Sequence, residues 1–172
     1  LLYCTTRASK NATYYYPIAE IINEKVLSKL RNSLTNRFFL AIHYMDAHTP
    51  YLEAVQHLLE PRNCIYLFRE SLKIHYKTTH NPSSITDEDR HMAILLYDAA
   101  IQYVDRHISA LLRELEKEGI GLDNTYVIIT SDHGEGFGEH GFFSHKEFLY
   151  DELLHVPLII CGCLLYTSPS PR

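Results

Sequence analysis

The chain has 172 residues, with 16 basic and 21 acidic side chains and a formal net charge of −5 at pH 7. This balance argues against a broad grip on nucleic-acid phosphates, which needs an excess of Lys and Arg. The hydrophobic fraction of 46% is ordinary for a globular protein, and no run is long and apolar enough to cross a bilayer.

The two ends of the chain do not resemble natural termini. Leu1 is not methionine, so we expect the chain to begin inside a longer reading frame. Residues 163–172 resemble the translation of a transposase sequencing adapter, and we interpret them as a non-native tail rather than a natural Pro/Ser tail. We therefore expect one partial domain over residues 1–162, with loose segments at residues 1–12 and 163–172.

The first predicted elements are a helix and a strand. Helical periodicity runs from Ile18 to Leu34. The apolar run of residues 38–44 predicts a buried strand, which ends in the polar segment Asp46-Ala47-His48-Thr49-Pro50-Tyr51. Residues 52–82 have no sustained period, and we expect short helices and loops there.

The clearest predicted element is a long helix over residues 87–117. Thr86 can cap its N-terminus, and three acidic residues follow in the first turn, where the helix dipole favours them. A coiled coil is the alternative, but the short length and the strand that follows favour a helix packed on a sheet. The apolar residues at alternating spacings of three and four form a stripe that we expect to be buried: Ile94, Tyr97, Ile101, Val104, Ile108, Leu111 and Leu115.

Three further elements complete the chain. Residues 125–130 predict a strand, residues 148–154 a short helix and residues 156–160 a final buried strand. Strands that alternate with helices in this way are typical of an α/β fold, with a mostly parallel sheet and flanking helices. We expect this fold, incomplete at both ends. Ligands of such sheets bind beyond the carboxyl ends of the strands.

The most informative segment follows the strand of residues 125–130 and reads Thr-Ser-Asp-His-Gly-Glu-Gly-Phe-Gly-Glu-His. Asp132 and His133 stand where the chain turns out of the strand, so both side chains can point at one centre. A carboxylate oxygen and an imidazole nitrogen form a ligand pair for a divalent metal. A hydrogen-bonded turn is the plainer interpretation of an isolated Asp-His-Gly. The glycines permit positive φ and close backbone approach.

In this order and spacing, the segments resemble the C-terminal part of the catalytic domain of sulfatases, in the alkaline-phosphatase-like superfamily of metal-dependent hydrolases. The matching stretches are residues 39–51, 97–105, 127–141 and 145–159. The resemblance implies that residues 1–162 are a partial sulfatase-like catalytic domain. It also implies hydrolysis of sulfate esters, with a small-molecule or glycan ester as the substrate.

The resemblance implies roles for five residues. Asp132 and His133 match metal ligands, although many sulfatases carry asparagine at the second position and the phosphonate-hydrolase-like members carry histidine. His48 matches a histidine that contacts the ester oxyanion or the leaving group. Lys146 or His145 matches a residue that the family brings to the substrate. Charge favours Lys146, whereas a histidine-glycine variant of the local pattern would favour His145.

The cofactor implied by the family is Ca²⁺, whereas the nitrogen ligand of His133 favours Mn²⁺ or Zn²⁺, because calcium prefers oxygen ligands. The family's nucleophile lies in a Cys/Ser-x-Pro-x-Arg motif and is oxidised to formylglycine in true sulfatases. This motif does not occur in the sequence, nor does the family's first acidic metal pair. We therefore expect both in a missing part, and we expect the chain to be inactive alone.

Three classes of function stay open. The first is a sulfate-ester hydrolase. The second is a phosphoryl enzyme of the same superfamily: a phosphodiesterase, a phosphonate monoester hydrolase or a phosphoglycerol transferase. The third is a non-catalytic module, against which the intact Asp132 and His133 argue. A cysteine in the lost motif would favour the first class, and a threonine the second.

The remaining polar residues have plainer interpretations. We expect Glu135 and Glu139 to order the glycine loop rather than to act as acids. His140 either orients Asp132 or His133 or is an ordinary loop histidine. Five further histidines show no spacing logic and are expected at the surface: His57, His75, His80, His91 and His107.

Overall fold

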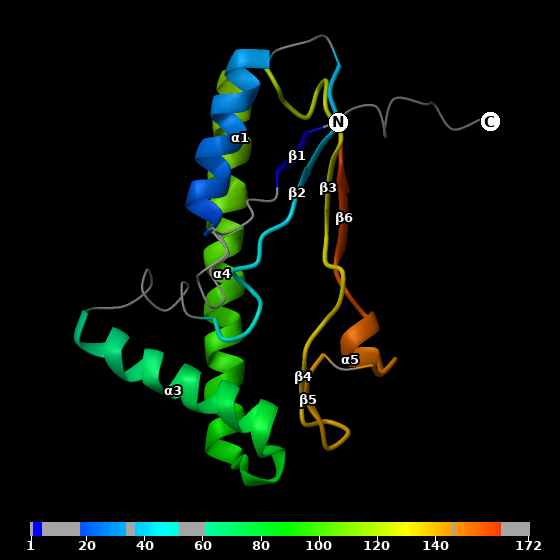
Figure 1. The fold of residues 1–172 in the computed structure, drawn as a ribbon. Helices are drawn as coiled ribbons and strands as arrows, with labels where there is room; N and C mark the ends of the chain where they lie inside the picture. The colour runs from blue at the N-terminus through cyan, green and yellow to red at the C-terminus, as the bar shows by residue number, and fades with distance from the viewer. Residues whose placement is uncertain (1, 5–17, 34–36, 52–60, 146, 163–172) are drawn as a thin grey trace, which may run out of the picture. The chain divides into compact units, whose positions relative to one another are not determined.

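A computed structural model describes residues 2–4, 18–33, 37–51, 61–145 and 147–162 (Figure 1). They are helices and short strands, which confirms a mixed α/β fold. The chain divides into two compact units, residues 1–111 and 112–172, and each has its own architecture. Within the described part of the chain, no helix is long and apolar enough to cross a membrane. The expectations for residues 5–12 and 163–172 fall outside the described residues.

In the first unit, strand β1 (Leu2–Cys4) pairs in parallel with strand β2 (Leu40–Ile42), and Leu2 lies opposite Leu40. The expectation of a loose N-terminus is therefore wrong for residues 2–4, because the backbone of β2 pairs with them. The predicted strand at residues 38–44 is confirmed at its centre. It is half-buried rather than buried, since β1 is its one neighbour among the described strands.

Helix α1 (Ala19–Ser33) confirms the first predicted helix. Its buried stripe consists of Ile22, Val26 and Leu30, which recur every four residues on one face. The backbone N–H of Ala19 donates to Asp46 Oδ1 at 3.0 Å. The buried Asp46 carboxylate thus caps α1 from the segment that follows β2 and meets the positive end of the helix dipole.

Helix α3 (Pro61–His80) is one continuous helix of 20 residues, so the predicted short helices and loops are wrong for this stretch. Its buried face carries Ser71 and Ile74, with His75 half-buried beside them. Two of these three side chains are polar, and a hydrophobic pattern therefore shows no helical period. A short 3-10 turn, Pro82–Ser84, follows the helix.

Helix α4 (Asp87–Lys117) has the predicted bounds and the predicted cap. The backbone N–H of Asp89 donates to Thr86 Oγ1 at 3.2 Å, and the backbone N–H of Thr86 donates to Asp89 Oδ2 at 3.0 Å. This reciprocal pair satisfies two backbone donors that the first turn of a helix otherwise leaves unpaired.

The buried face of α4 differs from the prediction. Leu111 and Leu115 are buried as expected, but Ile101 is 44% exposed. The other buried hydrophobic positions are Ala93, Leu96, Ala100 and Tyr103. The predicted stripe followed the large side chains, whereas two of these buried residues are alanines, which weigh little in a hydrophobic pattern. The observed buried positions precede the predicted ones by one residue along this part of α4, and one residue corresponds to a rotation of about 100° around the helix axis.

In the second unit, strand β3 (Val127–Thr130) pairs antiparallel with strand β6 (Leu158–Cys161), and Thr130 lies opposite Leu158 (Figure 1). The expected parallel arrangement is wrong for this pair, and a mostly parallel sheet stays a prediction. The predicted buried final strand is also wrong, because Leu158 is 65% exposed in this two-stranded sheet.

The antiparallel direction of β6 has a local cause. The backbone N–H of Gly134, just after β3, donates to the carbonyl of Leu153 at 2.8 Å. Leu153 belongs to the four-residue helix α5 (Asp151–Leu154), which lies just before β6. The chain is thus still beside the carboxyl end of β3 when β6 starts, and β6 runs back along its neighbour. A parallel neighbour would need a crossover to the other end.

The glycine-rich segment forms an unpredicted hairpin, in which β4 (Gly136–Phe137) pairs antiparallel with β5 (Phe143–Ser144). Gly138 and Gly141 bracket its turn with φ of 99° and 77°, a conformation that glycine adopts without strain. Glu139 Oε2 accepts the backbone N–H of Phe137 at 2.6 Å, which supports the expected ordering role of Glu139.

Asp89 makes the stability of the first unit depend on pH. The buried carboxylate pairs with Lys77 and lies 3.2 Å from Lys73 Nζ. Burial raises the pKa of Asp89, but hydrogen bonds from Lys77, the Thr86 backbone and Lys73 outweigh it and hold the pKa well below the ordinary 3.8. A depressed folded-state pKa contributes stability above the unfolded pKa, and that contribution is lost as the pH falls through the folded-state value.

We therefore expect Asp89→Asn to lower the free energy of unfolding by a constant amount above about pH 5, and by a shrinking amount below about pH 4. Denaturant titrations across this range measure the difference. Asp105→Asn, at an exposed position of the same helix, is the matched control and should show little difference. A pH-independent difference for Asp89→Asn would contradict the assignment.

Candidate functional site

His48 lies in the turn that follows β2 in the first unit. Its backbone N–H donates to the Met45 carbonyl at 3.0 Å, and its own carbonyl accepts the N–H of Tyr51 at 3.2 Å. The ring Nδ1 lies 2.8 Å from the Thr49 carbonyl oxygen. A carbonyl can only accept, so Nδ1 carries the proton. Nε2 is then an acceptor in the neutral ring and a second donor when the ring is protonated.

The backbone of this turn is held in an uncommon conformation. Tyr51 has a φ of 56°, which a non-glycine residue seldom adopts. Its side chain is buried, and its ring centroid lies 5.7 Å from that of Tyr97 on α4. Such a conformation persists where surrounding packing fixes it. The turn that carries His48 therefore has one defined shape.

Asp132 and His133 follow β3 in the second unit, as predicted. The side chain of Asp132 is 66% exposed. His133 Nδ1 lies 2.7 Å from the Gly134 carbonyl oxygen, so Nδ1 donates and the neutral ring presents Nε2 as its acceptor. That nitrogen lies 3.9 Å from Asp132 Oδ1. Two ligands of one divalent ion, each about 2.0–2.6 Å from it, can be this far apart.

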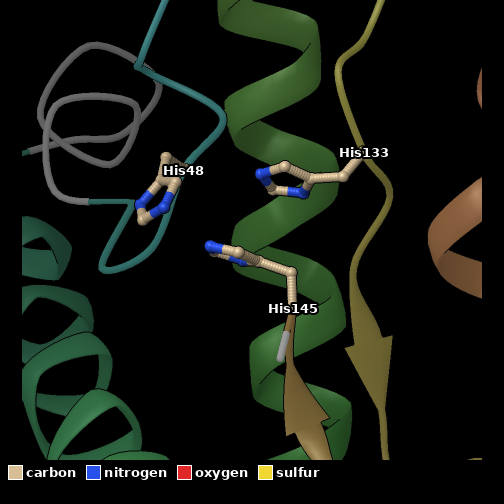
Figure 2. Close-up of side chains that lie close together, drawn as sticks. All are labelled: His48, His133 and His145. Carbon is tan, nitrogen blue, oxygen red and sulfur yellow. The ribbon is translucent and has the colours of Figure 1, made fainter. Parts of the chain in front are cut away.

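His145 lies against His133 (Figure 2). The two ring centroids are 4.0 Å apart, and the ring planes are inclined by 23°. His145 Nδ1 lies 3.5 Å from Oε1 of the buried Glu135. Ser144, just before His145, has a φ of 72°, a second left-handed non-glycine position beside a candidate residue. The structure thus brings His133 and His145 together and places a carboxylate behind the latter.

The contact between Glu135 and His145 was missed by sequence reasoning. Gly136 and Ser144 are paired residues of the hairpin, so residues 135 and 145 flank that pair. A predicted hairpin with this register of β4 and β5 would have revealed the contact. The sequence was instead interpreted as an open glycine loop, which specifies no pairing between its residues. The expectation that Glu135 orders this segment is compatible with its buried contact.

His140 does not orient the Asp132–His133 pair through any contact that the structure describes. Its Nδ1 lies 2.7 Å from Glu152 Oε1, and its ring stacks on Tyr150 with centroids 3.9 Å apart. Desolvation raises the pKa of Glu152, but the hydrogen bond from His140, a backbone hydrogen bond and the electrostatic attraction of His140 together outweigh it and leave that pKa below its ordinary value. His140 therefore links the hairpin turn to α5.

Lys146 lies outside the described residues. Figure 2 labels His48 with His133 and His145, and His48 belongs to the first unit while the other two belong to the second. Within the second unit, His133 and His145 each offer one ring nitrogen as a possible metal ligand.

The histidines expected at the surface divide into two groups. His80 and His91 are exposed, as predicted, and His57 lies outside the described residues. The expectation is wrong for the half-buried His75 and His107. His75 Nδ1 lies 3.1 Å from Thr49 Oγ1, and the ring of His107 packs on Tyr103 with centroids 4.4 Å apart. The first contact joins α3 to the turn after β2, whereas the second is a contact between residues four apart within α4. The spacing of the histidines reveals neither of them.

Comparison with known proteins gives a consistent result. The sulfatase family model matches residues 3–163. Over 64 residues, 37% of the chain, the sequence is 50% identical to an N-acetylglucosamine-6-O-sulfatase of Bacteroides thetaiotaomicron. It is 30% identical over 72% of its length to the uncharacterized sulfatase YidJ of Escherichia coli, and 26% identical over 84% of its length to a choline-sulfatase of Rhizobium meliloti. No solved structure matches the chain.

The matched part is small compared with these relatives. The alignments cover 11%, 26% and 31% of the Bacteroides, Escherichia and Rhizobium proteins, respectively. The chain therefore corresponds to about a third or less of each.

The close approach at Gly134 gives a test of the packing between α5 and the end of β3. A Cβ added there would lie 2.0 Å from the Glu152 carbonyl oxygen. We expect Gly134→Ala to separate α5 from the end of β3 and to lower the free energy of unfolding by about 1–3 kcal/mol in denaturant titrations. Gly121→Ala is the control, because its Cβ would meet the flexible end of Asp123. Equal stability of the two variants would contradict the described packing.

Proposed function

Because the chain belongs to the sulfatase family, we propose that it supplies metal ligands and charge-stabilising residues to the active site of a sulfate-ester hydrolase. The observation that carries this proposal is the Asp132–His133 pair, with Oδ1 and Nε2 3.9 Å apart just beyond β3. The sulfatase names of the relatives support the reaction class. The activity is proposed for a protein that contains this chain together with a nucleophile.

The donor set of the pair fits a divalent metal. The Gly134 carbonyl fixes the proton of His133 on Nδ1, so that Nε2 can coordinate while the ring is neutral. Asp132 supplies a carboxylate oxygen. We propose Ca²⁺ as the family's ion, with Mn²⁺ or Zn²⁺ as alternatives that suit the imidazole better. When bound, the ion would neutralise the anionic oxygens of the ester and lower the pKa of an oxygen nucleophile.

The remaining residues act on charge and protons. We propose that protonated His48 donates from Nε2 to the oxygen of the leaving group, because its Nδ1 is already committed to the Thr49 carbonyl. Lys146 or His145 would stabilise negative charge on the transferred sulfuryl group. The contact of His145 with Glu135 supports a fixed position for that imidazole. The nucleophile is proposed to be a formylglycine outside this sequence.

The proposed substrate is a sulfate ester of a small molecule or a glycan. The relatives named above act, by their names, on sulfated N-acetylglucosamine and on choline sulfate. One observation favours a second candidate, a phosphate or phosphonate ester: a histidine stands at position 133, where phosphonate-hydrolase-like members carry one. Parallel assays with nitrophenyl sulfate and nitrophenyl phosphate distinguish the two candidates.

The metal assignment predicts a specific loss. In the full-length enzyme, Asp132→Ala should abolish stoichiometric metal and sulfatase turnover, because one imidazole cannot replace the carboxylate ligand. Elemental analysis of the purified protein measures the first effect. Asp123→Ala, at an exposed position of the same unit, should keep its metal. Unchanged metal content in Asp132→Ala would refute the assignment.

The role of His48 predicts a dependence on the leaving group. In the full-length enzyme, His48→Ala should slow the hydrolysis of alkyl sulfates by about 10²–10⁴-fold. Nitrophenyl sulfate should be affected much less, since its leaving group departs without a proton. His91→Ala, at an exposed histidine, is the control and should leave both rates unchanged. Equal losses on the two substrates would contradict proton donation.

The 172-residue chain alone should not hydrolyse either nitrophenyl ester. Turnover by this chain that Asp132→Ala abolishes would show that the catalytic centre has been misplaced.

A further inference from the structure

We propose that α3 positions the catalytic imidazole of His48, and that Ser71 and His75 are the positioning residues. This inference rests on the proposed role of His48 and extends it to a helix whose sequence gave no functional signal. Ser71, His75 and the turn that carries His48 all belong to the first unit.

The two positioning residues reach adjacent points of one turn. Ser71 and His75 are four residues apart in α3, so they lie on the same face of the helix, one turn from each other. Ser71 Oγ donates to the carbonyl oxygen of Pro50. His75 Nδ1 lies 3.1 Å from Thr49 Oγ1. Helix α3 thus contacts the side chain of Thr49 and the backbone carbonyl of Pro50.

Thr49 is the residue on which the orientation of His48 depends. Its carbonyl oxygen accepts the Nδ1 proton of His48 at 2.8 Å. If the Thr49 peptide rotated, this acceptor would move and the imidazole ring would turn with it. Bonds from α3 on either side of that peptide therefore fix the direction in which His48 presents Nε2. A hydrogen bond at the second ring nitrogen is the usual way to orient a functional histidine.

Burial shows that these contacts are more than packing. Ser71 is among the most buried side chains that the structure describes, and His75 is half-buried. A polar group in such a place costs stability unless it is hydrogen-bonded, and an apolar residue would pack there without that cost. Burial also lowers the pKa of His75, and nearby charges of His48 and His80 lower it further. A neutral His75 places no like charge beside a protonated His48.

Hydrogen exchange tests the positioning without any assay of catalysis. In the 172-residue chain, His75→Leu and Ser71→Ala should speed the amide exchange of residues 45–51 by about tenfold. His75→Asn, which keeps a polar atom near the place of Nδ1, should retain slow exchange. His80→Leu is the matched control, since the contacts described for the His80 ring are with Thr79 and Tyr76 of its own helix. Unchanged exchange in both His75→Leu and Ser71→Ala would overturn the proposal.

Kinetics in the full-length enzyme test whether the positioned group is His48. His75→Leu should lower kcat for both substrates, and the fold reduction should be at least ten times larger for an alkyl sulfate than for nitrophenyl sulfate. KM should be nearly unchanged. His75→Asn should restore most of the loss, and His80→Leu should cause none. An equal loss on both substrates, or an equal loss in His80→Leu, would overturn the proposal.

A second pair of variants covers the case in which His75→Leu does not fold. Thr49→Val removes the hydroxyl partner of His75 with little change of shape, whereas Thr49→Ser keeps it. Exchange of residues 45–51 should be faster in the first variant and slow in the second, and equal rates would refute the proposal. If the wild-type enzyme hydrolyses no sulfate ester, the proposed function fails, and the exchange measurements still decide whether α3 fixes the turn.

Discussion

The buried carboxylate of Asp46 is the group on which the first unit depends. It accepts the backbone N–H of Ala19 and thereby joins the start of α1 to the turn after β2. Two further bonds extend this junction. Tyr44 Oη donates to Asn23 Oδ1 at 2.6 Å, and Asn23 Nδ2 donates to the His107 carbonyl at 2.8 Å. The end of β2, α1 and α4 therefore share one polar network. Loss of the carboxylate would leave a helix terminus with an unsatisfied donor in a buried place.

The parts of the fold that sequence could predict are those with local causes. The capping pair of Thr86 and Asp89 lies within four consecutive residues, and α1 shows its buried stripe in its own periodicity. The helix at Pro61–His80 could not be recognised, because Ser71 and His75 occupy its buried face. The direction of β6 was equally hidden, since the bond between Gly134 and Leu153 that reverses the chain joins residues nineteen positions apart.

The candidate site also has a part that the sequence could predict and a part that depends on tertiary structure. Asp132 and His133 are neighbours in sequence, and their place after a predicted strand marked them as candidates. Their assignment as metal ligands came from the order and spacing of several segments that resemble sulfatases. The stack of His133 on His145 depends on the hairpin between them, which a glycine-rich sequence does not specify. The contact of His75 with Thr49 depends on the docking of a helix against a turn 26 residues away. Residue types identified the candidate ligands, whereas the residues that hold them in place come from tertiary structure.

The hydrogen bond between Gly134 and Leu153 also closes the segment between these residues into a loop whose two ends are held together. The two ends of the segment between Gly134 and Leu153 therefore lie next to each other beside the end of β3. Such a loop can lengthen or shorten at its tip at little entropic cost, because closure entropy grows slowly with loop length. The strand register and the Asp132–His133 pair would not move with it. This architecture lets the segment between Gly134 and Leu153 change in length or sequence while the two proposed metal ligands, Asp132 and His133, keep their positions.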